Sequence, residues 1–198
     1  MRNASNFEFC KRLECKKDIG GEIDDLMKLA KAGIDIVGFD TTYIKGVSCF
    51  ENIKDKGCLG FVEKWYDDPF GNLAENLQPG DEQKCAEDRE YTDKAVSDAL
   101  NKSKDSMLVG MREQSKEKKK ISAASILKIA QFAYNKNYWI NDLQGFLSST
   151  GVFRVADPGE LIESSGMGDD ATACFYNWTC SLVTLLDSSL GEQCVKLD

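Results

Sequence analysis

The sequence predicts an all-α, disulfide-rich helical protein built from two similar helical repeats joined by a long helix. Three observations lead to this fold class. Apolar residues recur at helical spacing in most long segments, eight cysteines occur without a single histidine, and one pattern of residues occurs twice. With 198 residues and 42% hydrophobic side chains, the chain is long enough to bury a core.

The repeated pattern determines the predicted domains. The first copy consists of Ile23, Asp25, Leu26, Leu29, Gly33, Ile34, Val37, Tyr43, Ile44, Cys49 and Phe50. The second consists of Ile140, Asp142, Leu143, Phe146, Gly151, Val152, Val155, Leu161, Ile162, Cys174 and Phe175. The order of residue types is kept, so we interpret the copies as one supersecondary unit used twice, although any two amphipathic helices ending at glycine share such a pattern. Residues 1–85 are then the first cysteine-containing helical repeat, 86–120 a helical linker, and 121–198 the second cysteine-containing helical repeat.

Helices are expected throughout the first repeat. Residues 7–13 carry a short apolar helical face. A helix of about three turns starts near Glu22 and ends at Gly33, because glycine readily adopts the left-handed conformation of a C-terminal cap. The apolar run 34–39 is too short to separate strand from helix, and its helical neighbours favour helix. Residues 59–66 are expected to form a helix with its aromatic side chains inward.

The linker has the longest helical pattern of the chain. A continuous helix over 86–120 would be about 50 Å long, so we expect it to bend or break near Gly110. The lysine-rich run 116–120 lies at the end of this helix. We interpret it as a solvated basic turn that complements the helix dipole, and the alternative is a nuclear-import or anion-binding patch.

The second repeat is also expected to be helical. Residues 121–134 and 139–147 are predicted helices, and Pro158 is expected to open a further helical turn. Asp169, followed by Asp170, is expected to cap the last helix, because a carboxylate accepts hydrogen bonds from the free N–H groups of a first turn.

All eight cysteines are expected to form disulfides within the chain, because they show no zinc-type spacing. They are Cys10, Cys15, Cys49, Cys58, Cys85, Cys174, Cys180 and Cys194. Five precede the linker and three follow it, so at least one disulfide must join the two halves. The repeat suggests two equivalent pairs, Cys58–Cys85 and Cys180–Cys194. Cys10 and Cys15 would lie about 7.5 Å apart along one helix, too far to pair, and would therefore take Cys49 and Cys174 in some order.

Several features indicate a secreted, extracellular glycoprotein. Disulfides form in oxidising compartments, and three sequons are present, at Asn3, Asn101 and Asn177. The first residues lack the apolar stretch of a signal peptide, so we expect a mature form behind an added methionine. No run of about 18 apolar residues suggests a membrane span.

Composition disfavours several classes of function. A net charge of −8 argues against nucleic acid and anionic membranes as partners, and we expect neither. The absence of histidine excludes every catalytic triad or dyad that uses imidazole, and no metal site or cofactor is expected. A glycosidase with two carboxylates is the remaining enzymatic alternative, for which Asp40, Glu51 and Glu63 are the only acids in apolar surroundings. We predict no enzyme and name no catalytic residue.

A carrier of a small apolar ligand is a second alternative. Aromatic residues from both halves could line its pocket, although such residues at helical spacing more often belong to a core. They are Phe61, Trp65, Tyr66, Phe70, Tyr134, Tyr138 and Trp139.

Two cysteine clusters contain or adjoin aromatic residues. The first is Cys58, Tyr66 and Cys85, and the second is Cys174-Phe175-Tyr176 with Cys180. These clusters resemble the paired Cys-Tyr-Cys motifs of the "bicycle" secreted salivary effectors of gall-forming aphids. The resemblance implies a protein that is injected into host tissue and acts by binding, and it transfers no site residues. The predicted function is therefore that of a secreted, non-enzymatic effector or interaction protein that binds a host or extracellular protein partner.

Overall fold

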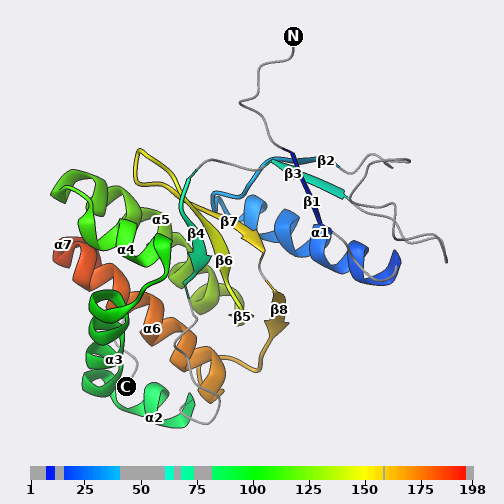
Figure 1. Cartoon of the computed structure of the whole chain (residues 1–198). Coiled ribbons are helices and arrows are strands. Elements are labelled where there is room, and N and C mark those ends of the chain that lie inside the picture. The colour runs from blue at the N-terminus through cyan, green and yellow to red at the C-terminus, as the bar shows by residue number, and fades with distance from the viewer. Residues whose placement is uncertain are drawn as a thin grey trace.

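A computed structural model describes residues 8–11, 16–40, 61–64, 68–73, 82–157 and 159–194 (Figure 1). The helices are α1 (Lys16–Lys31), α2 (Glu82–Glu87), α3 (Arg89–Lys102), α4 (Ser106–Glu113), α5 (Lys116–Lys136), α6 (Asp170–Leu186) and α7 (Ser188–Gly191). The strands are β1 (Glu8–Lys11), β2 (Phe39–Asp40), β3 (Phe61–Lys64), β4 (Phe70–Asn72), β5 (Tyr138–Asn141), β6 (Gln144–Leu147), β7 (Phe153–Asp157) and β8 (Glu160–Glu163). The described part is thus mainly helical, as predicted, but it is not all-α because it also contains small antiparallel sheets.

Side-chain caps define where several helices begin. Asp88, Asp105, Ser115 and Asp169 each accept a hydrogen bond from a backbone N–H in the first turn of α3, α4, α5 and α6, respectively. The predicted cap at Asp169 is confirmed. After α1 the backbone adopts a φ of +80° at Gly33, which confirms the predicted left-handed turn.

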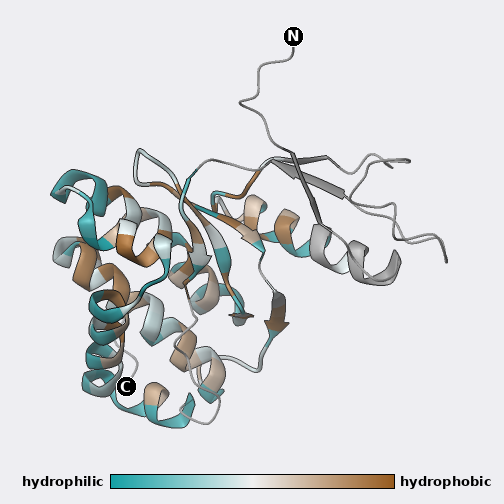
Figure 2. Ribbon diagram, viewed as in Figure 1, coloured by the Kyte–Doolittle hydropathy of each residue, from teal (hydrophilic) through white to brown (hydrophobic). Residues whose placement is uncertain are grey.

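Helix α6 lies at the centre of the core. It packs against α5 on one side and against α2 and α3 on the other (Figure 1). Its side chains are buried almost all the way round between Thr172 and Val183, as expected for a helix enclosed by others. Figure 2 shows the hydrophobic faces of α5 and α6 turned toward the neighbouring elements. No helix within the described ranges is long and apolar enough to cross a membrane.

The sheets connect the N-terminal segment to this helical body. Strands β4, β6 and β7 form one antiparallel sheet, β5 pairs with β8, and β1, β3 and β2 form the third sheet. A parallel bridge joins Ile36 to Val155 of β7, where the Val37 N–H donates to Val155 and the Val155 N–H donates to Asp35, both at 2.9 Å. In β6, a Cβ at Gly145 would collide with the Arg154 carbonyl, so glycine permits the close pairing of β6 and β7.

The predicted repeat is wrong. Residues 23–31 belong to helix α1, whereas the matching residues of 140–155 form β5, β6 and the start of β7. In β7, Phe153 and Val155 are buried and Arg154 between them is half-buried, which is the period-two alternation of a strand. A shared order of apolar residues and glycine therefore does not reflect a shared supersecondary unit here.

The predicted long helix over 86–120 is also wrong. The chain breaks after α3 at 103–105 and after α4 at 114–115, where Asp105 and Ser115 cap the helices that follow. Gly110, the predicted break, lies within α4, and a Cβ there would be 3.2 Å from the Leu147 side chain. The glycine lets α4 pack closely on β6.

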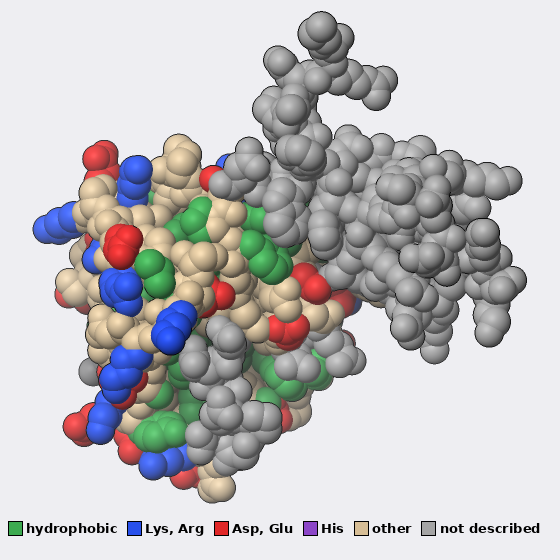
Figure 3. All heavy atoms as spheres, viewed as in Figure 1, with side chains coloured by type: hydrophobic (Ala, Val, Ile, Leu, Met, Phe, Trp, Pro, Cys, Tyr) green, Lys and Arg blue, Asp and Glu red, His purple; other side chains and the backbone are tan. Residues whose placement is uncertain are grey.

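The break at 114–115 changes the interpretation of the lysine-rich run 116–120. These lysines lie in the first turns of α5, at the positive end of its dipole, and do not end a helix. Figure 3 shows lysine and arginine side chains interspersed with carboxylates along the side formed by α3, α4 and the start of α5. Such a mixture of signs is typical of a solvated surface.

Other predicted helices are strands. Residues 8–11 of the expected 7–13 helix form β1, and Phe39–Asp40, at the end of the 34–39 run, forms β2. Residues 61–64 form β3, and 139–147 contributes to β5 and β6. Each run is short, and pairing with a distant strand overrides the local preference for helix. Pro158 lies outside the described residues.

Two disulfides join described cysteines. Cys85 in α2 is bonded to Cys174 in α6, with 4.9 Å between the Cα atoms, and Cys180 is bonded to Cys194, with 6.0 Å. Cys85–Cys174 links the two halves of the sequence, which confirms that at least one disulfide does so, and the predicted Cys180–Cys194 pair is also confirmed.

The predicted Cys58–Cys85 bond is wrong. The predicted bond from Cys174 to Cys10 or Cys15 is also wrong. The reason is that α2 packs along α6 and brings Cys85 beside Cys174. Cys15, Cys49 and Cys58 lie outside the described residues.

The Cys85–Cys174 connection predicts the outcome of peptide mapping. Trypsin should release the peptide 85–89, because it is bounded by Lys84 and Arg89, and the peptide 155–196, which contains three cysteines. In a non-reduced digest the two should appear as one covalent species, with Cys180–Cys194 closed inside the longer peptide. Mass spectrometry before and after reduction makes the measurement. A link from peptide 85–89 to 57–64, which carries Cys58, would contradict the structure.

Candidate functional site

The residues singled out as candidate acids and aromatics do not form one site. Among the candidate acids, Glu51 lies outside the described residues, and the structure does not describe the side chains of Asp40 and Glu63, which lie in β2 and β3. No group of three or more potential metal ligands occurs in the described part of the chain.

The described aromatic residues make separate contacts. The Phe70 ring lies 4.9 Å from that of Phe146, and the Tyr134 ring lies 5.3 Å from that of Tyr176. Tyr138 stacks on Phe132 with the ring centroids 5.7 Å apart. These pairs belong to different clusters of the core, so the described members of the predicted apolar pocket are not packed together as one group.

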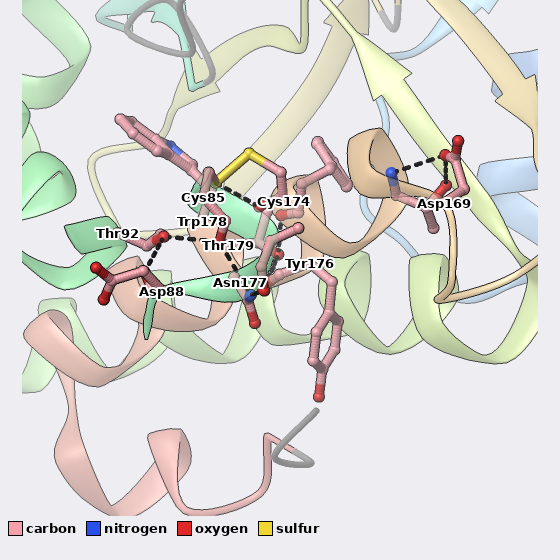
Figure 4. Close-up of a disulfide and its surroundings, with 12 residues drawn as sticks. Cys85, Asp88, Thr92, Asp169, Cys174, Tyr176, Asn177, Trp178 and Thr179 are labelled. Carbon is pink, nitrogen blue, oxygen red and sulfur yellow. Dashed lines mark hydrogen bonds between the residues drawn. A yellow bond between two sulfur atoms is a disulfide. The ribbon is translucent and has the colours of Figure 1, made fainter. Parts of the chain in front are cut away.

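A different site forms where the turn between α2 and α3 meets α6 (Figure 4). Asn177 of α6 is only 3% exposed, and its Nδ2 donates to the backbone carbonyls of Cys85 at 3.1 Å and Ala86 at 3.0 Å. The Thr92 hydroxyl contacts the carbonyls of Cys85 and Asp88 at 2.9 and 3.1 Å. These bonds satisfy carbonyls that the end of α2 would otherwise leave unpaired.

Beside this turn lies a cleft of about 730 Å³ between the α2–α3 turn and the α6–α7 segment. Its volume falls within the range of small-molecule sites. The lining residues are Ala86, Glu87, Arg89, Asp93, Asn177, Thr184, Ser188, Gly191, Glu192 and Cys194. Most of them are polar, so the cleft suits a ligand that makes hydrogen bonds.

The charged residues of the cleft are partly connected to one another. Arg89 Nε lies 3.3 Å from Asp93 Oδ1, and the Ser181 hydroxyl donates to the same carboxylate. Glu87 accepts a hydrogen bond of 3.0 Å from Gln83 along its own helix. Arg89 and Asp93 are thereby held on the wall that α3 contributes.

Helix α7 forms the opposite wall. The Cys180–Cys194 disulfide ties the residues after α7 to α6, and Gly191 lies so close to Thr184 that a Cβ would collide with it. Asp187 caps α7 by accepting from the Leu190 N–H at 3.1 Å. Hydrogen bonds from the Ser189 hydroxyl and from Leu190, with the charge of Lys120, lower the pKa of Asp187.

The three sequons have different environments. Asn101 is exposed at the end of α3, and Asn3 lies outside the described residues. Asn177 is buried, and the nitrogen that would carry a glycan donates to the carbonyls of Cys85 and Ala86. Thr179 of that sequon is buried too, and its hydroxyl donates to Phe175 at 2.9 Å. The folded chain therefore leaves no room for a glycan at Asn177.

Sequence reasoning missed this cleft. Glu87, Arg89 and Asp93 lay in the predicted linker, and Asn177 was interpreted as a glycosylation site. A usable signal was present in α6, where the amide of Asn177 lies between the apolar residues Tyr176 and Trp178 of a largely apolar helix. Such a residue needs buried hydrogen-bond partners.

Replacing Asn177 should destabilise the protein. Asn177→Ala would remove the side-chain donor to the Ala86 carbonyl and one of the two donors to the Cys85 carbonyl, at a cost of about 1–3 kcal/mol in the free energy of unfolding. Urea unfolding of the oxidised protein measures this quantity. The exposed Asn101→Ala serves as the control and should change it by less than about 0.5 kcal/mol. Equal effects of the two substitutions would show that the Asn177 bonds do not stabilise the turn.

The cap of α7 should weaken in acid. Because the pKa of Asp187 is lowered by folding, its carboxylate stabilises the folded state at any pH above the pKa of the unfolded state. This contribution is lost as the pH falls through the folded pKa. The amide NMR shift of Leu190 should therefore titrate at a pH below the ordinary range of an aspartate. Asp187→Asn, which keeps a capping oxygen but cannot ionise, should abolish that titration. A midpoint above the ordinary aspartate value would contradict the assigned hydrogen bonds.

Comparison with known proteins adds no family to these observations. No protein-family model matches the chain, and no curated protein matches it. The resemblance to the salivary effectors therefore depends on the cysteine and aromatic residues alone. In the structure, Cys85 and Cys174 of the two clusters are bonded to each other.

Proposed function

We propose that this protein is an extracellular, non-enzymatic binding protein whose ligand enters the cleft between the α2–α3 turn and the α6–α7 segment. The observation that carries the proposal is the construction of the cleft. One wall is fixed by the Cys85–Cys174 disulfide and the other by Cys180–Cys194. A site with fixed walls loses little conformational entropy when a ligand binds to it, and this favours high affinity.

The side chains that line the cleft can offer hydrogen bonds and charge to a ligand. Charged and hydroxyl-bearing side chains, including Glu87, Arg89 and Ser188, outnumber apolar ones around the cleft. A carrier of apolar ligands instead needs a predominantly hydrophobic lining. At this cleft we therefore favour recognition by hydrogen bonds and charge over transport of an apolar molecule.

The extracellular location is supported by the disulfides. Bonds such as Cys85–Cys174 form and persist in oxidising compartments. An effector role in host tissue remains part of the proposal, supported by the resemblance to the salivary effectors. Binding at a preformed cleft is compatible with such a role.

Blocking the cleft should abolish ligand binding. Ser188 is exposed at the start of α7 and lines the cleft, so Ser188→Trp should fill part of the space without disturbing the core. Ala32→Trp, at the exposed residue that follows α1 and is not part of the cleft lining, is the matched control. The oxidised proteins would be screened by thermal unfolding against amines, carboxylates, sugars and fatty acids, because a ligand that binds only the native state raises the unfolding midpoint.

At least one of these classes should stabilise the unmodified protein and Ala32→Trp but not Ser188→Trp. If no class does so, or if Ser188→Trp responds as the control does, the cleft is not the binding site.

A further inference from the structure

Asn177 lines the cleft, and its side-chain oxygen has no hydrogen-bond donor among the described residues. Both hydrogen bonds of this side chain use Nδ2, and the two carbonyls that accept them fix which end of the amide is nitrogen. Figure 4 shows the oxygen on the side of the amide turned away from those carbonyls. No described residue donates to Oδ1, although Asn177 lines the cleft and is only 3% exposed. A buried acceptor without a donor is rare in native proteins and indicates a missing donor.

The charges around the cleft favour a cationic donor. Three carboxylates, those of Glu87, Asp93 and Glu192, line it against one guanidinium, that of Arg89. Arg89 is paired with Asp93, so its charge is already balanced. The Glu192 carboxylate has neither an ion pair nor a hydrogen bond among the described residues. The cleft therefore has an excess of negative charge and of acceptors.

These two observations are independent and require the same chemistry. The buried amide oxygen of Asn177 needs an N–H or O–H donor, and the unpaired Glu192 carboxylate favours positive charge. An alkylammonium group provides three N–H donors and one positive charge in a compact head. The methylene chain behind it could lie along Ala86 and the Cys180–Cys194 disulfide, the apolar part of the lining.

We propose that the cleft binds a ligand that presents a primary ammonium group, with Asn177 Oδ1 and the Glu192 carboxylate as acceptors. This inference rests on the proposed function and specifies its ligand. The ammonium group could belong to a free amine or to a lysine side chain of a protein partner. The chemistry at the cleft is the same in both cases.

Calorimetry with small probes tests the inference. The probes are n-butylamine, its neutral analogue n-butanol, the anion butyrate, and a tripeptide Gly-Lys-Gly with blocked termini. We expect n-butylamine to bind, n-butanol and butyrate not to bind, and the affinity to fall with added salt because the charges are partly exposed. Binding of the tripeptide as well would identify a protein lysine as an acceptable source, and binding of the amine alone would identify a small molecule. Both results support the ammonium site.

Conservative variants locate the contact. Glu192→Gln keeps the size of the side chain and should raise the dissociation constant of n-butylamine about fivefold, a typical loss for a partly exposed ion pair. Glu117→Gln, on the exposed first turn of α5, removes the same charge outside the cleft and should leave that constant unchanged. Asn177 itself is a poor first test because its substitution also removes bonds that hold the α2–α3 turn.

Two results would overturn the inference. One is n-butanol or butyrate binding as tightly as n-butylamine, and the other is an equal effect of Glu192→Gln and Glu117→Gln. If some other ligand class still binds and Ser188→Trp blocks it, the proposed function stands and only the ammonium assignment fails. If nothing binds in a way that Ser188→Trp prevents, both fail.

Discussion

The attachment of the α2–α3 turn to α6 is the interaction on which the helical body depends. The Asn177 amide holds two carbonyls of the turn, and the Cys85–Cys174 disulfide fixes the same turn covalently. Close by, the indole of Trp178 donates to the Leu73 carbonyl at 3.2 Å. These contacts place α2 and α3 on α6, and α3 in turn forms one wall of the cleft. Without them, a short helix such as α2 would have little stability of its own.

Part of the fold was readable from the sequence because it is decided locally. The last helix, its cap at Asp169 and the turn at Gly33 follow from capping chemistry within a few residues. The covalent link between the halves followed from counting cysteines on each side of 86–120. The strands were not readable, since β6 pairs with β4, where Phe70 faces Phe146 from more than seventy residues away. In short apolar runs such non-local pairing decides between helix and strand.

The candidate site was less predictable than the fold. Its lining comes from segments around 86–93 and 177–194, which only the packing of α2 and α3 on α6 brings together. The meaning of Asn177 also depends on burial. An exposed asparagine in a sequon accepts a glycan, whereas this one uses the same nitrogen to stabilise a turn. The sequence alone does not contain that distinction.

The long separation of Cys85 from Cys174 has a consequence for biosynthesis. Cys174 is synthesised 89 residues after Cys85. At ordinary translation rates this takes about 5 to 18 s. During that interval Cys58 is the nearest cysteine already made, 27 residues earlier in the chain (85 minus 58). A nascent chain in an oxidising lumen can therefore close an early, non-native bond that later thiol–disulfide exchange has to undo. The disulfide that fixes α2 on α6 can therefore form only after Cys85 has passed an earlier possible partner in the chain.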